Sequence, residues 1–225
     1  MQEPNVSSQE EAITADAKHE IHSGNASQIG AHRGPKESQT IFTIGHSTRT
    51  IAEFVALLQQ VKVDLLVDLR SIPRSRATPR FNREVLPVSL SAEGNGYQHL
   101  GALGGRRHHA TGALPSTNMF WRVLAFRNYA DYAETDAFRS GFAELLELGR
   151  THRCGIMCAE AVWWRCHRRI IADYLLAHGV PVEHIMGLGT VTPATLTPGT
   201  LVLSDGTLRY PAPDLDDGDD EWSAN

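Results

Sequence analysis

The sequence predicts an α/β protein: a three-layer sandwich in which helices cover both faces of a mostly parallel, Rossmann-like sheet of about five strands. Two observations lead to this fold class. Short apolar runs typical of buried strands alternate along the chain with longer segments of helical spacing. In addition, residues 41–69 read as strand, helix and strand in immediate succession, and such a βαβ unit implies parallel strands.

The first βαβ unit begins with the apolar run Ile41–Ile44, which we predict to be a buried strand. Residues 51–61 then place apolar side chains at helical spacing. Thr50 and Glu53 have the spacing of a capping box, in which each side chain satisfies a backbone N–H near the other residue. We therefore predict a helix at 51–61 and a second strand at 64–69.

The remaining elements are read in the same way. We predict a short helix within residues 82–90 that Pro87 interrupts, a brief strand at 97–100, and one long helix or two helices broken near Thr135 within 128–150. A strand at 155–157, a helix from Trp164 to Gly179, a strand at 182–186 and a C-terminal β-hairpin at 201–210 complete the set. The predicted sheet order is 3-2-1-4-5, with the switch point between the first and fourth strands.

The central part of the chain is expected to form one domain between two disordered ends. Residues 1–39 are rich in Ser, Gln and Glu, and residues 211–225 are acidic; both compositions are typical of disorder. Residues 40–210 are long enough for one hydrophobic core. The formal net charge of −5 is concentrated in the two ends, so the predicted domain carries a mild excess of Lys and Arg. This excess suits an anionic ligand but is smaller than nucleic-acid-binding domains usually show.

The sequence also excludes some classes of protein. No apolar run approaches the ~20 residues that a membrane-spanning helix needs. The N-terminus lacks the basic start and apolar core of a signal peptide. The chain has three cysteines, and an odd number without a secretion signal indicates reduced thiols. We expect a cytoplasmic protein without a membrane partner, and the oligomeric state stays open.

Polar and reactive side chains gather where the predicted strands end. Because the carboxyl ends of parallel strands share one edge of a sheet, we expect these side chains to form one site. The residues are His46 and Ser47 after the first strand, Asp68 and Arg70 after the second, Cys158 and Glu160 after the fourth, and Cys166 and His167 in the helix that follows.

Four of these residues are candidates for catalysis. Cys158 lies at a strand end, before a helix N-terminus and near arginines, and this environment lowers a thiol pKa and favours a nucleophilic thiolate. Its alternative role is that of a small apolar residue that fills the strand end. Glu160 is a candidate acid or base, or an ion-pair partner of an arginine. His46 is a candidate for proton transfer, and His167 is predicted to point towards the sheet.

A second group of residues is expected to bind substrate. The arginines of residues 70–83 either form a solvated basic loop or clamp a phosphate or carboxylate, which guanidinium groups bind in bidentate fashion. Nearby aromatic side chains such as Trp163 would stack on a base. The candidate substrate ligands are Ser47, Asp68, Arg70, Arg74, Arg80, Tyr97, His99 and Arg168.

The cysteines leave metal and redox roles open. Cys158, Cys166 and His167 are the residues that would bind a zinc or iron ion if one were present, with Glu160, His46 or His99 as the fourth ligand. Their spacing matches no compact zinc motif, so we predict no metal and leave the cofactor unknown. A redox disulfide would join Cys158 and Cys166 if the turn between them folds back. Cys154 lies too far along the strand to pair with Cys158.

Seven short motifs follow one another along the chain: Thr43-Ile44-Gly45-His46-Ser47, Val67-Asp68-Leu69-Arg70, Pro79-Arg80-Phe81, Tyr97-Gln98-His99-Leu100, Leu103-Gly104-Gly105, Cys158-Ala159-Glu160 and Cys166-His167-Arg168. The chain resembles the domain of unknown function 488 family, from about Thr40 to Gly187. The resemblance implies a compact α/β protein with the motifs grouped together, and it implies no reaction, substrate or cofactor. Residues 162–164 depart from the more polar, proline-containing turn of relatives.

Three functions follow from these observations. The first is a cytosolic enzyme that acts on a phosphorylated or nucleic-acid-derived anion at the carboxyl edge of the sheet. The second is a nucleotide or nucleic-acid binding module, whose affinity would depend on salt and on the arginines but not on Cys158. The third is a thiol redox or metal-dependent sensor.

Overall fold

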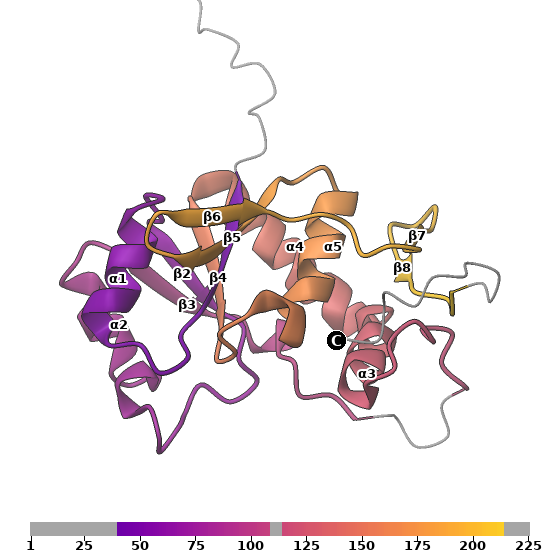
Figure 1. The fold of residues 1–225 in the computed structure, drawn as a ribbon, viewed down its shortest axis with the longest axis horizontal. Helices are drawn as coiled ribbons and strands as arrows, with labels where there is room; N and C mark the ends of the chain where they lie inside the picture. Colours follow the sequence, from indigo (N-terminus) through magenta and orange to yellow (C-terminus); the bar gives the residue numbers. More distant parts are fainter. Residues whose placement is uncertain (1–39, 109–113, 214–225) are drawn as a thin grey trace, which may run out of the picture. The chain divides into compact units, whose positions relative to one another are not determined.

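A computed structural model describes residues 40–108 and 114–213, in which helices cover both faces of a six-stranded sheet (Figure 1). The predicted disorder of residues 1–39 falls outside the described residues, as does nearly all of the predicted tail at 211–225. The three-layer α/β class predicted from the sequence is confirmed. No helix in the described ranges has the length and apolar character needed to cross a membrane.

The main sheet has the order β3-β2-β4-β1-β5-β6. The first five strands run parallel to their neighbours, and β6 pairs with β5 in the antiparallel direction. The edge strand β6 was not predicted, because its residues are mostly exposed and lack an apolar run. The strands are β1 (Ile41–Gly45), β2 (Leu65–Asp68), β3 (Gly96–His99), β4 (Cys154–Cys158), β5 (Val182–Gly187) and β6 (Thr190–Pro193).

The predicted sheet order 3-2-1-4-5 is wrong in one respect. The fourth strand lies between the first and the second, where β4 pairs with β1 through Gly45↔Cys158 and with β2 through Leu65↔Cys154. All five residues of β4 are buried, which suits a strand with a neighbour on each side. The first and fourth strands are neighbours, as predicted, and this pairing places His46 beside Cys158.

Helices cover the sheet in two layers (Figure 1). On one face, α1 (Ile51–Gln59) and α2 (Leu86–Ser91) pack with Phe42, Ile44 and Leu66. On the other face, α3 (Leu124–Ala133), α4 (Asp136–Thr151) and α5 (Arg168–Ala177) pack with Ile41 and Ile156 among others. Neighbouring residues of a strand thus enter different cores, since successive side chains point to opposite faces.

Helix ends explain where the predictions hold and where they fail. The capping box of Thr50 and Glu53 is present, and Thr135 caps α4, so the segment near 128–150 forms two helices. Pro87 does not interrupt α2 but lies in its first turn, where its missing N–H costs no hydrogen bond. The helix predicted from Trp164 begins only at Arg168, because residues Trp163–Arg165 form the 3₁₀ turn η3.

The C-terminal hairpin is confirmed as β7 (Leu201–Val202) and β8 (Leu208–Arg209). Gly206 has a φ of 81°, which a glycine adopts without strain in the turn. Two further 3₁₀ turns, η1 (Pro79–Phe81) and η2 (Gly101–Leu103), belong to the long excursion between β2 and α3. This excursion and the loops after β1 and β4 surround the carboxyl edge of the sheet.

Candidate functional site

A cleft of about 540 Å³ lies at the carboxyl edge of the sheet. Its walls come from the loops after β1, β2 and β4, from residues 105–106 and from residues 125–126 at the start of α3. A cleft at this position is expected because parallel strands all end at one edge and their loops can separate there. The cleft therefore collects side chains that are far apart in the sequence.

The loops after β1 and β4 approach each other closely. The parallel pairing continues past the strand ends, since the N–H of His46 donates to Cys158 O (3.0 Å) and that of Ser47 donates to Ala159 O (3.0 Å). A Cβ atom at Gly45 would collide with the carbonyl oxygen of Glu160, so only glycine allows this approach. Ser47 adopts a positive φ of 48°, an uncommon conformation for a residue other than glycine.

His46 is held as a neutral imidazole. Its ring stacks on Phe81 with centroids 4.4 Å apart, and Nδ1 donates to Ser47 O over 2.9 Å. Nε2 faces Arg70 Nη1 at 3.4 Å and so accepts from that guanidinium. Burial and, to a smaller extent, the charge of Arg70 lower the pKa of His46 to about 4, although the hydrogen bond to the Ser47 carbonyl opposes this change.

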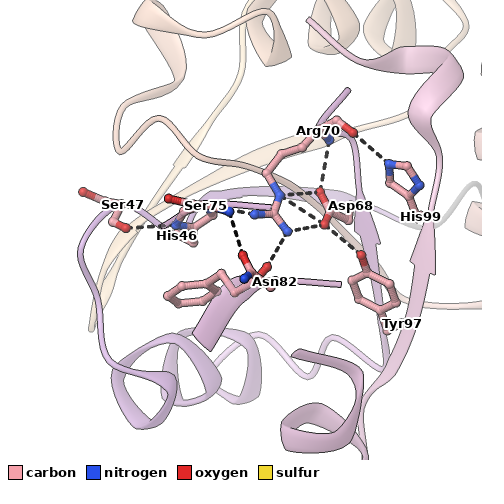
Figure 2. Close-up of polar contacts among 9 residues, drawn as sticks. His46, Ser47, Asp68, Arg70, Ser75, Asn82, Tyr97 and His99 are labelled. Carbon is pink, nitrogen blue, oxygen red and sulfur yellow. Dashed lines mark hydrogen bonds and ion pairs between the residues drawn. The ribbon is translucent and has the colours of Figure 1, made fainter. Parts of the chain in front are cut away.

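A buried ion pair supports this part of the site (Figure 2). Arg70 folds back on Asp68, with Nε donating to Oδ1 over 2.9 Å and Nη2 to Oδ2 over 2.5 Å. Asp68 is fully buried and also accepts from the hydroxyl of Tyr97 at 2.9 Å. His99 Nε2 donates to the carbonyl oxygen of Arg70 over 2.8 Å. Asp68, Tyr97 and His99 thus hold Arg70 in place. Of these four residues, only Arg70 lines the cleft.

Two further arginines hold loops in place. Arg80 donates through Nη2 and Nε to the carbonyl oxygens of Thr48 and Arg49, both at 2.7 Å. Arg168 is buried and donates to Glu160 O at 2.6 Å and to the sulfur of Cys166 at 3.3 Å. Neither arginine lines the cleft. Both guanidinium groups are occupied by protein acceptors, which suits positioning of loops better than contact with substrate.

Two thiols and an imidazole meet at the floor of the cleft. His167 Nδ1 lies 3.8 Å from Cys158 Sγ and 3.5 Å from Cys166 Sγ. The three ligand atoms all lie within 4.8 Å of one another, and the thiols are free. Gly105 makes room for the ring, because a Cβ there would collide with His167. Within the described ranges, no other group of three or more His, Cys, Asp or Glu side chains is placed closely enough for one metal ion.

The predicted direction of the Cys158 pKa is wrong. The hydrogen bond that Cys158 donates to Cys166 raises the pKa of Cys158, and burial raises it further. Burial also opposes ionisation of Cys166, but the hydrogen bond from Cys158 and the charges of His167 and Arg168 outweigh it and lower the pKa of Cys166. The sequence did not predict that Cys166, and not Cys158, has the lowered pKa. It does not show that the turn at 159–165 brings the two thiols together.

A comparison of sequences identifies the family. The sequence model described as "Domain of unknown function DUF488" matches residues 50–175. The chain belongs to the DUF488 family. Searches of curated proteins and of solved structures found no match. The matched range of the DUF488 domain includes the Asp68–Arg70 pair and the three residues of the thiol cluster, whereas His46 and Ser47 precede it.

The structure of the DUF488 domain brings together most of the predicted site. All four candidates for catalysis line the cleft, and so do Ser47, Arg70 and Arg74 among the candidate substrate ligands. Arg74 is exposed and pairs with Glu84 at 2.6 Å. The predicted residues that do not line the cleft are Asp68, Arg80, Tyr97, His99 and Arg168, and the lining residues that the sequence analysis did not select include Ser71, Ser75, Arg106, Phe126 and Arg165.

Arg106 and Arg165 were missed although both lie in stretches that the sequence makes conspicuous. Arg106 belongs to the arginine-rich excursion, and Arg165 follows the pair of tryptophans. The local sequence does not distinguish an arginine that faces a cleft from one that donates hydrogen bonds to a loop. Arg70, Arg74, Arg106 and Arg165 surround a space whose one lining carboxylate, among the described residues, is Glu160.

Proposed function

We propose that the DUF488 domain is an enzyme that binds a phosphorylated or nucleic-acid-derived anion in the cleft and transforms it at the Cys158, Cys166 and His167 cluster. The observation that carries the proposal is the position of the cluster. Thiols and an imidazole lie at the floor of a cleft whose walls carry arginines. Reactive groups at a concave, charged surface are typical of enzyme sites.

The arginines at the walls supply the binding part of the proposal. Arg106 and Arg165 are exposed, so their guanidinium groups are hydrated and accessible to a ligand. A guanidinium group offers paired N–H donors that match two oxygens of a phosphate or carboxylate. The neutral His46 and the hydroxyl groups of Ser47, Ser71 and Ser75 add polar contacts that carry no charge.

A binding module without catalysis is supported less well. Arg70, Arg80 and Arg168 donate to acceptors of the protein itself, so the arginine-rich sequence does not become an extended basic surface of free guanidinium groups. Such a surface is what backbone binding of nucleic acid requires. A cytoplasmic location, where thiols stay reduced, is part of the proposal.

The binding step is tested by the double variant Arg106→Gln/Arg165→Gln. Isothermal titration with inorganic phosphate and with adenosine monophosphate should show binding weakened at least about tenfold, because each charge-assisted hydrogen bond contributes about 1.5–3 kcal/mol. Arg139→Gln is the matched control, since this exposed arginine on α4 pairs with Asp136 and does not line the cleft. Equal affinities in all three proteins would contradict anion binding at the cleft.

The catalytic step is tested separately by screening turnover of phosphomonoesters and nucleotides. Cys158→Ala should lose turnover of any substrate found while it retains binding of phosphate, because its thiol belongs to the floor and not to the arginine wall. Turnover that survives in Cys158→Ala would remove the cluster from the reaction.

A further inference from the structure

The spacing of the atoms in the thiol cluster corresponds to a metal coordination shell. In tetrahedral zinc sites the Zn–S distance is about 2.3 Å and the Zn–N distance about 2.0–2.1 Å, so a sulfur and a nitrogen ligand lie about 3.6 Å apart. His167 Nδ1 lies 3.8 Å from Cys158 Sγ and 3.5 Å from Cys166 Sγ. The two sulfurs lie within 4.8 Å of each other, which allows the separation of about 3.8 Å of a tetrahedral edge.

The surroundings hold these ligands in place. The ring of His167 packs against Tyr129, with centroids 5.0 Å apart, and fills the space that Gly105 leaves open. Its Nε2 is buried without a hydrogen-bond partner among the described residues, and its Nδ1 is the nitrogen directed at the two sulfurs. Arg168 donates to Cys166 Sγ at 3.3 Å, a contact of the kind that orients and stabilises a thiolate ligand.

We propose that Cys158, Cys166 and His167 bind one divalent metal ion of the zinc class, with the fourth coordination position open to the cleft. Three protein ligands and one open position are typical of catalytic zinc sites, whereas structural sites use four protein ligands. All three residues line the cleft, so water or an oxygen of an anionic ligand can reach the fourth position. On binding, the proton that the two sulfurs share passes to solvent, and the two thiolates balance the charge of the ion.

The sequence indicated these three residues as the candidate metal ligands, but no metal was predicted, because they do not form a compact motif. Cys158 ends β4, whereas Cys166 and His167 follow η3 and immediately precede α5. The backbone between them turns so that the sulfurs meet, and Arg168 secures that turn through Glu160 O. Metal binding goes beyond the proposed function, since the ion can bind whether or not the arginines hold an anion.

The test is a titration of the metal-free full chain with Co²⁺, which reports thiolate ligands through a charge-transfer band in the near ultraviolet. We expect one Co²⁺ per chain, displaced by Zn²⁺. Cys158→Ala and Cys166→Ala should abolish the band or weaken Co²⁺ binding at least about 100-fold, and His167→Ala should weaken it as well. Cys154→Ala is the matched control, because this buried cysteine lies on β4 outside the cluster and should leave the titration unchanged.

A second measurement on the unaltered chain avoids variants that fail to fold. Zn²⁺ should protect Cys158 and Cys166 from alkylation, as located by mass spectrometry. The proposal is overturned if Co²⁺ gives no charge-transfer band, if the Cys158 and Cys166 variants bind Co²⁺ as tightly as the parent chain, or if Zn²⁺ leaves alkylation of both thiols unchanged. Phosphate binding by the Arg106→Gln/Arg165→Gln protein is measured independently, so a failed metal site and a failed anion site are distinguished.

Discussion

At the scale of single residues, the arginines of the site fall into two groups with different physical roles. Arg70 and Arg168 are almost fully buried and each satisfies several protein acceptors, whereas Arg106 and Arg165 are exposed at the cleft. Burial of a guanidinium group costs free energy unless the group is paired, so Arg70 and Arg168 stay bound to their protein acceptors. Arg106 and Arg165, being exposed, stay hydrated and can exchange that hydration for a ligand. The same residue type therefore both holds the loops around the cleft and lines its walls.

The Asp68–Arg70 pair gives the sharpest prediction at this scale. Asp68→Asn leaves the Arg70 charge buried without its carboxylate, and we expect the free energy of unfolding to fall by about 3–5 kcal/mol in urea titrations. Glu84→Gln is the matched control, because it removes the partner of Arg74 in a fully exposed ion pair and should leave the unfolding midpoint unchanged. A similar midpoint for both variants would mean that the buried pair has no special role in stability.

Sequence reasoning at the residue scale identified types of side chain better than their partners. His46, Cys158, Glu160 and His167 were selected because polar residues at strand ends meet in a parallel sheet, and all four line the cleft. The roles of Arg80 and Cys158 depend on atoms from other loops. Arg80 contacts the carbonyl oxygens of residues 48 and 49, and Cys158 donates to Cys166. No local pattern encodes these contacts.

At the scale of elements, helix boundaries follow from capping chemistry where a cap exists. Thr50 accepts from the N–H of Glu53, and the Glu53 carboxylate accepts from the N–H of Thr50. Thr135 caps α4 in a similar way and separates it from α3. No side chain caps α5, which begins after η3. This absence explains why hydrophobic spacing alone placed the start of that helix at Trp164.

The cap of α1 can be tested directly. Thr50→Ala removes the acceptor for an N–H in the first turn, and we expect a loss of about 1 kcal/mol in the free energy of unfolding. Thr151→Ala serves as the control, because that hydroxyl donates to carbonyl oxygens at the end of α4 and caps no N-terminus. Urea unfolding followed by circular dichroism measures both. An unchanged midpoint in Thr50→Ala would show that water replaces the cap without loss.

At the scale of elements, the sequence predicted the strands but not their complete order in the sheet. Alternating apolar segments predicted the parallel strands and the neighbouring positions of the first and fourth. They did not predict that β4 lies between β1 and β2, because strand order depends on contacts between residues far apart in sequence, such as Leu65↔Cys154. Both orders keep the first and fourth strands adjacent, so the position of the cleft at their carboxyl ends was predicted although the order was wrong.

At the scale of the whole domain, the segment after β6 is attached to the layer of helices by buried polar contacts. Asp173 on α5 accepts from the N–H of Thr197 at 2.9 Å and from the hydroxyl of Tyr210 at 3.1 Å. Tyr174, the next residue of α5, accepts from the N–H of Leu208 at 3.1 Å. Asp173 is only 1% exposed, so one carboxyl group joins α5 to both ends of the hairpin segment.

This attachment makes the stability of the domain depend on pH. Burial raises the pKa of Asp173 from 3.8 to about 6, although the hydrogen bonds from Thr197 and Tyr210 and the charge of Arg169 oppose the rise. The folded state therefore holds this proton more tightly than the unfolded state does. The contribution of Asp173 to stability is largest below pH 4 and is lost as the pH rises to about 6, by roughly 3 kcal/mol in total.

Asp173→Asn should remove that dependence. An amide offers an oxygen to the N–H of Thr197 and has no charge to bury, and the hydroxyl of Tyr210 can accept from its NH₂ group. We expect the variant to be more stable than the parent chain at pH 7 and similar to it at pH 4. Chemical denaturation from pH 4 to 7 measures the difference, which other titrating groups do not affect because they are common to both proteins. A constant difference across this range would contradict a raised pKa and would leave Asp173 ionised in the folded domain throughout.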